Sequence, residues 1–188
     1  MARYGETSVK VLRRLRAWIL MRSFDSRGSD IYRAVHHLSD NAFFFADYSR
    51  EFFEDVDTLL RTGKVKQVKR LLVYDDEHEV GTAESRKIIQ FHCVTSGYDC
   101  RALSTARWVS ILKNGSFAPT LDIGIFGEQR AYRAPRDKPD YVLGTWTGNK
   151  KEVQQLIALF EDCWHEGWCP PCDPSSELSI RELFSVRK

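Results

Sequence analysis

The segment LDIGIFGEQRAYRA, residues 121–134, constrains the fold more than any other part of the chain. Apolar and polar residues alternate along it, the alternation breaks at Gly127 and Glu128, and it then resumes. A two-residue period on both sides of a short turn predicts two antiparallel strands joined as a β-hairpin. Strand patterns and helical patterns alternate before it, and a strand and a long amphipathic helix follow it, which predicts an α/β domain.

The segments around the hairpin follow a regular order from Val68 onward. Crossover helices between the early strands favour parallel pairing, and the hairpin adds antiparallel strands. The prediction is therefore a mixed β-sheet flanked by helices. In chain order the predicted elements are strand 68–74, helix 82–96, strand 98–103, helix 105–113, hairpin 122–134, strand 141–146 and a helix capped by Asn149.

The first part of the chain predicts helices. One extends from Thr7 or Ser8 to about Phe24, a short one follows at 30–38, and a third spans 51–62. The histidines at 36 and 37 are interpreted as ordinary surface or packing residues. The predicted organisation is a helical extension over 1–64, an α/β domain over 65–168 and a C-terminal tail over 169–188.

The N-terminal segment is basic on a nearly neutral chain. Residues up to Ala34 hold eight Lys or Arg and three Asp or Glu, whereas the formal net charge of the whole is +2. The first helix is expected to pack on its own domain or on a dimer partner. The alternatives are contact with nucleic-acid phosphates through Arg13 and Arg16, or an anionic membrane surface.

The number of cysteines and the distribution of apolar residues indicate the cellular compartment in which the protein is expected. Five cysteines in 188 residues lack the density of a disulfide scaffold, which suits a reducing environment. Arg13, Arg14 and Arg16 interrupt the apolar residues that a signal peptide would need. No apolar run approaches the roughly 20 residues that span a bilayer. We expect a cytoplasmic protein without a membrane span.

The segment CWHEGWCPPC places Cys163, His165, Cys169 and Cys172 within ten residues. Thiolates and imidazoles are the ligands of structural zinc, and Cys169 and Cys172 have the two-residue gap of a zinc knuckle. A structural zinc ion is therefore a candidate, and no other cofactor is indicated. A redox dithiol and no site at all are the competing interpretations.

The helix that precedes this segment limits the ligand set. Residues two apart do not share a helix face, so Cys163 and His165 can act together only if the helix ends near Cys163. A further alternative is a set of two or three ligands from this segment and a remote one, such as Cys93 or Cys100.

An acidic loop over 75–79 follows the strand 68–74. The carboxyl end of a strand in an α/β sheet is a common position for a ligand or metal site. The competing interpretation is an ordinary solvated loop.

The segment from Val68 to Trp164 resembles one half of a phospholipase-D-like domain. Active members of that family use a His-x-Lys motif with a downstream Asp, in which the histidine attacks a phosphodiester. The predicted hairpin, where the motif would align, contains no histidine, and no histidine of the chain is followed two residues later by lysine. The resemblance is carried by VKRLLVY, YDCRAL, LDIGIFGEQRAYRA and KEVQQLIALFEDCW, and the histidines are His36, His37, His78, His92 and His165.

The resemblance implies a non-catalytic regulatory or ligand-sensing module that forms a homodimer. One alternative is a nucleic-acid-associated protein that uses the basic N-terminal helix. Another is a metal-dependent enzyme that uses the acidic loop 75–79. A serine-hydrolase elbow, a Walker phosphate loop and a dinucleotide-binding glycine motif are all missing from the sequence.

Overall fold

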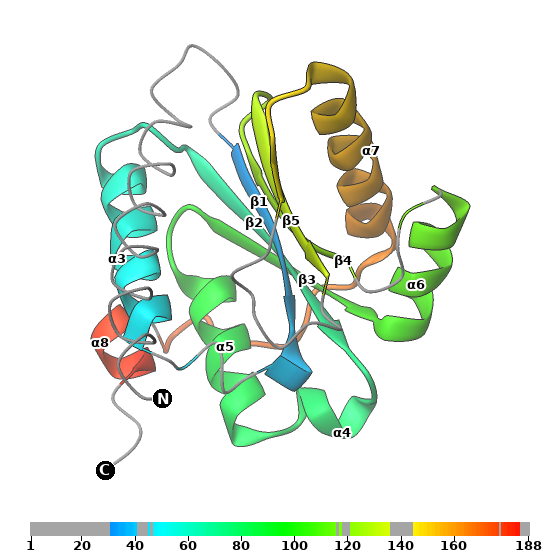
Figure 1. The fold of residues 1–188 in the computed structure, drawn as a ribbon. Coiled ribbons are helices and arrows are strands. Elements are labelled where there is room, and N and C mark those ends of the chain that lie inside the picture. The colour runs from blue at the N-terminus through cyan, green and yellow to red at the C-terminus, as the bar shows by residue number, and fades with distance from the viewer. Residues whose placement is uncertain are drawn as a thin grey trace, which may run out of the picture.

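The computed structural model describes residues 31–40, 45, 47–115, 117, 121–135, 145–176 and 178–184. Within these ranges the chain forms a six-stranded sheet with the order β3-β2-β1-β4-β5-β6 (Figure 1). The strands are β1 (Ile31–His37), β2 (Gln67–Tyr74), β3 (Tyr98–Ser104), β4 (Leu121–Phe126), β5 (Arg130–Pro135) and β6 (Thr145–Thr147). The helices are η1 (Leu38–Asp40), α3 (Asp47–Arg61), α4 (Glu77–Val80), α5 (Ala83–Val94), α6 (Thr105–Asn114), α7 (Lys150–Glu166) and α8 (Ile180–Leu183).

The sheet is parallel in one half and antiparallel in the other. β2 pairs in parallel with both β1 and β3. β4 is antiparallel to β1, β5 to β4, and β6 to β5. The predicted mixed sheet flanked by helices is confirmed, and the chain has an α/β fold.

The predicted hairpin is confirmed as β4 and β5. Gly127 begins the turn with a φ of 60°, a left-handed conformation that glycine adopts without a steric penalty. The predicted caps are also present: the side chain of Thr82 accepts from Ser85 N, and that of Asn149 accepts from Glu152 N. The turn and the caps could be predicted from the sequence because each depends on residues a few positions apart and not on a distant part of the chain.

The helix predicted at 30–38 is wrong, because Ile31–His37 form β1, at the centre of the sheet. Six of the seven residues of IYRAVHH are buried, including His36 and His37. A strand that is covered on both faces shows no alternation of apolar and polar residues. Periodicity therefore cannot distinguish it from a short buried helix. The sheet therefore takes a strand from the range 1–64, which the sequence patterns assigned to a helical extension.

Helices cover both faces of the sheet, as Figure 1 shows, with α3 and α5 on one face and α6 and α7 on the other. Alternate residues of β2 serve the two layers. Val68 and Leu72 pack with the α3/α5 face, and Leu71 and Val73 pack with the α6/α7 face. The interior is thus divided into two apolar clusters, one on each side of the same strands.

Several predictions for the N-terminal segment lie outside the described residues. The helix expected from Thr7 or Ser8 to Phe24, with Arg13 and Arg16, is among them. In the described part of the chain, no helix has the length and apolar content needed to cross a bilayer.

The packing of α7 gives a direct test of the fold. Leu156 is fully buried between α7 and the sheet, and its neighbour Gln155 is exposed. Leu156→Ala should lower the free energy of unfolding by about 2–5 kcal/mol, because it removes buried methyl groups and leaves a cavity. Gln155→Ala should stay within about 0.5 kcal/mol of the parent. Denaturant unfolding measures both, and equal effects of the two variants would contradict the packing of α7.

Candidate functional site

The acidic loop lies at the carboxyl end of β2, as expected, but its carboxylates serve local structure. Asp75 Oδ1 accepts a hydrogen bond from Thr105 Oγ1 at 2.6 Å. Asp76 Oδ1 caps α4 by accepting from Glu79 N at 2.9 Å, and Glu79 Oε2 accepts from Asp75 N at 2.6 Å. The loop is therefore closed on itself and on the start of α6 by capping and turn contacts.

The predicted ligands Cys163 and His165 lie on different sides of α7. The helix continues to Glu166, so the two side chains do not share a face. Cys163 is buried against the α6/α7 face, where burial raises the pKa of its thiol to about 12. His165 is exposed in the last turn.

The chain after α7 is fixed to the body of the protein at two places. Trp168 and Ala102 exchange two backbone hydrogen bonds, of 3.0 and 2.8 Å, along the outer edge of β3. Further on, Asp173 N donates to Gln90 Oε1 at 2.9 Å, and Gln90 Nε2 donates to the Asp173 and Ser176 carbonyl oxygens. The segment between Trp168 and Asp173 is thus held against β3 and α5.

Three cysteines meet where this segment crosses α5. Cys93, one helical turn after Gln90, lies near the thiols of Cys100 and Cys172. Interaction with the Cys100 thiol is the main reason that the pKa of Cys93 is lowered, while the same interaction and burial raise the pKa of Cys100. All five cysteines of the chain are free thiols. The remote residues suggested by the sequence, Cys93 and Cys100, therefore lie with Cys172 and not with Cys163.

The thiols of Cys93, Cys100 and Cys172 are not arranged as the ligands of a metal centre. Among the described residues, no group of three or more His, Cys, Asp or Glu side chains is placed to hold a metal ion. Cys169 is exposed, three residues before Cys172.

A second polar group lies inside the α3/α5 face, around Arg70. This residue is at the middle of β2, between Ala34 of β1 and Cys100 of β3. Only 6% of Arg70 is exposed, and its Nε and Nη2 have no hydrogen-bond partner in the part of the chain that is described. Its guanidinium carbon lies 5.9 Å from the ring centre of Tyr32 and 5.6 Å from that of Phe53.

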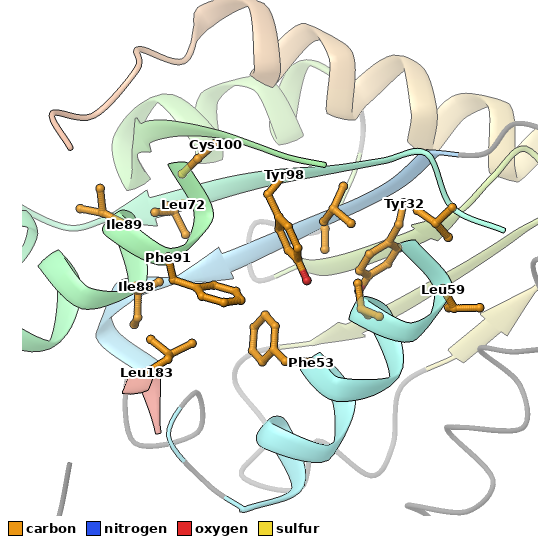
Figure 2. Close-up of a cluster of buried hydrophobic side chains, with 14 of the residues drawn as sticks. Tyr32, Phe53, Leu59, Leu72, Ile88, Ile89, Phe91, Tyr98, Cys100 and Leu183 are labelled. Carbon is orange, nitrogen blue, oxygen red and sulfur yellow. The ribbon is translucent and has the colours of Figure 1, made fainter. Parts of the chain in front are cut away.

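The surroundings of Arg70 are aromatic. Figure 2 shows Tyr32 and Tyr98 extending from the sheet toward Phe53 on α3 and Phe91 on α5. The hydroxyl of Tyr98 is buried and also has no hydrogen-bond partner among the described residues. Burial raises the pKa of Tyr98 and the charge of Arg70 opposes this effect only in part, so the hydroxyl keeps its proton.

His92 is part of the same interior. Its Nδ1 lies 2.8 Å from the carbonyl oxygen of Ile88, which can only accept, so Nδ1 carries the proton. Burial lowers the pKa of His92 well below its usual value, and the charge of Arg70 lowers it further. His92 is therefore a neutral core histidine.

On the opposite face of the sheet, the buried basic side chains are paired with a carboxylate. Arg33 Nε and Lys69 Nζ bind the two oxygens of Glu161 on α7, at 2.7 and 2.8 Å. Burial alone raises the pKa of Glu161, but the hydrogen bonds from Lys69 and Arg33 outweigh it and leave the pKa below its ordinary value. The α6/α7 face thus supplies a carboxylate to its buried arginine, and the α3/α5 face supplies none to Arg70 among the described residues.

The chain was compared with protein families, curated proteins and solved structures. No protein-family model, no curated protein and no solved structure matches the chain. The candidate sites therefore stand on their own geometry.

Arg70 is the functional candidate that sequence reasoning missed. The segment VKRLLVY predicts a strand with a buried centre, and Arg70 lies inside that centre. A charged residue in a strand covered on both faces was the available signal, because such a residue needs a partner or a ligand.

The carboxylate of Glu161 should make stability depend on pH. Glu161→Gln leaves Arg33 and Lys69 without a counter-charge, and we expect it to cost about 1–3 kcal/mol at neutral pH. Because the folded-state pKa of Glu161 is lowered, its contribution is present above the unfolded pKa of about 4.3 and is lost as the pH falls through the folded value.

The measurement is denaturant unfolding of both proteins from pH 7 down to pH 3. The difference between them should shrink toward acid, where Glu161 is protonated. Asp162→Asn, a change of an exposed neighbour, is the matched control and should show no such trend. A difference that stays constant with pH would exclude the ion pair as its cause.

Proposed function

We propose that this protein is a cytoplasmic, non-catalytic regulatory module that senses an anionic ligand, and that Arg70 binds that ligand. The observation that carries the proposal is a guanidinium group buried in the core with unpartnered N–H donors. The ligand class is a small oxyanion with a carboxylate or phosphate group, because a guanidinium fork matches the geometry of those groups.

The energetics of burial support a ligand at Arg70. Removing an arginine from water costs several kcal/mol unless an anion compensates it. Contact with the rings of Tyr32 and Phe53 returns only about 1–2 kcal/mol for each well-placed ring. A bound oxyanion would supply the missing counter-charge and would accept from the free Nε and Nη2 donors.

Tyr98 supports the same ligand class. Tyr98 lies on β3 two residues before Cys100, which is the residue opposite Arg70, so the two side chains are diagonal neighbours on one face of the sheet. Burial raises the pKa of Tyr98, so its hydroxyl keeps its proton and can donate. A cationic fork beside a neutral hydroxyl donor is complementary to a group that can only accept hydrogen bonds. A neutral acceptor could satisfy these donors, but only an anion also supplies the counter-charge that buried Arg70 lacks among the described residues.

The non-catalytic part of the proposal is supported by the hairpin. Residues of β4 and β5 include no histidine, which is the nucleophile that the phospholipase-D-like resemblance would require.

The test compares the parent protein with Arg70→Met at one ionic strength, in chloride buffer and in buffers that contain inorganic phosphate or acetate. In chloride, Arg70→Met should raise the free energy of unfolding by about 1–4 kcal/mol, because an apolar chain replaces an uncompensated charge. The oxyanion should stabilise only the parent, by about 2.7 kcal/mol at a hundred times its Kd. Thermal melting measures both effects.

Arg130→Met, which removes an exposed arginine at the start of β5, is the matched control and should respond to oxyanions as the parent does. If Arg70→Met destabilises the protein equally in every buffer, a carboxylate of the chain itself pairs with Arg70 and the sensing proposal is wrong. Equal stabilisation of the parent and Arg70→Met by oxyanions would also reject it, because the effect would then not pass through Arg70.

A further inference from the structure

Four cysteines converge on the outer edge of the sheet from two parts of the chain. Cys93 and Cys100 belong to α5 and β3, while Cys169 and Cys172 belong to the segment that follows α7. We propose that these four thiols form a structural site for a thiophilic divalent metal, with Zn²⁺ as the first candidate. Cys100 lies opposite Arg70 on the neighbouring strand, but none of the four thiols belongs to the oxyanion site proposed above, so the metal site is tested by a different measurement.

The backbone contacts place both cysteine pairs together. Trp168 lies opposite Ala102 in an antiparallel bridge, so the segment that contains Cys169 starts at the edge of β3, the strand that contains Cys100. At the other end, the hydrogen bonds between Asp173 and Gln90 hold the chain one helical turn from Cys93. Cys169 and Cys172 are thus held between two fixed points, within one short loop.

The side chains already follow this placement in part. Cys100 and Cys172 lie near Cys93. Cys169 is exposed, and no complete ligand arrangement exists among the described side chains. The proposed site requires the Cys169 side chain to turn toward the other three and supply the fourth sulfur.

The chemistry of the donor set selects the metal class. Four cysteine sulfurs in tetrahedral geometry are typical of structural zinc, and the pairing of a two-residue gap with a distant second pair is typical of such sites. Oxygen-seeking cations such as Mg²⁺ prefer carboxylates and water, which the four thiols do not offer. The fifth cysteine, Cys163, packs in the α6/α7 cluster and takes no part.

A metal at this position would join the C-terminal segment to the body of the protein. Beyond Cys172 the chain leads to α8, whose Leu183 is buried in the α3/α5 cluster. Short segments with little secondary structure of their own gain stability from a metal that links them to a larger core. The proposed site stands where that link is needed.

The experiment measures metal content in the full chain, purified under reducing conditions without chelator and without added metal. We expect about one equivalent of zinc in the parent protein. Cys93→Ser and the double variant Cys169→Ser with Cys172→Ser should lose it, and Cys163→Ser, the matched control, should keep it. Circular dichroism establishes that each variant is folded.

Cobalt(II) substitution in the parent protein is the second measurement, and it does not require that any variant folds. Strong visible absorption from tetrahedral cobalt bound to four thiolates would support the site. Less than about half an equivalent of zinc, together with cobalt spectra that lack thiolate bands, would overturn the proposal. A disulfide between Cys93 and Cys172 in metal-free, folded protein, detected by mass spectrometry, would overturn it in favour of a redox pair.

Discussion

The position of β1 determines most of the architecture. It is the one described strand that pairs in parallel with one neighbour and antiparallel with the other, β2 and β4. Because helices lie over both faces at this point, six of its seven residues are buried. The two apolar clusters, the order of the strands and the places of the helices all follow from a central strand that contacts every layer.

Buried charge distinguishes the two faces of this sheet. Arg33 and Arg70 lie on neighbouring central strands, and both are nearly inaccessible to water. Arg33 receives a carboxylate from α7, whereas Arg70 is surrounded by aromatic rings. The proposed oxyanion site rests on this difference in counter-charge between the two buried arginines.

Local signals predicted the parts of the fold that depend on nearby residues. The hairpin, β2, α5 and α7 were located because alternation, helical spacing and caps such as Thr82 and Asn149 act within a few residues. β1 was not located, because its strand state is imposed by β2 and β4, which lie far along the chain. The last helix, α8, lies in the segment predicted only as a C-terminal tail, and Ser179 caps it.

The candidate sites were predictable to a smaller extent. The motif CPPC is visible in the sequence, but its proximity to Cys93 and Cys100 depends on the pairing of Trp168 with Ala102 and of Asp173 with Gln90. Such contacts join residues more than sixty positions apart and have no local pattern. Likewise, VKRLLVY predicts a strand with a buried centre, and only the tertiary structure shows that Arg70 is buried without a carboxylate beside it among the described residues.

The bridge between Trp168 and Ala102 has one more consequence. β3 is the last strand on its side of the sheet, and an uncovered strand edge is a template for pairing with another molecule. By occupying the backbone groups of Ala102, the segment after α7 shields that edge from foreign strands. During synthesis β3 is complete well before Trp168 appears, so the growing chain passes through a period in which aggregation competes with folding.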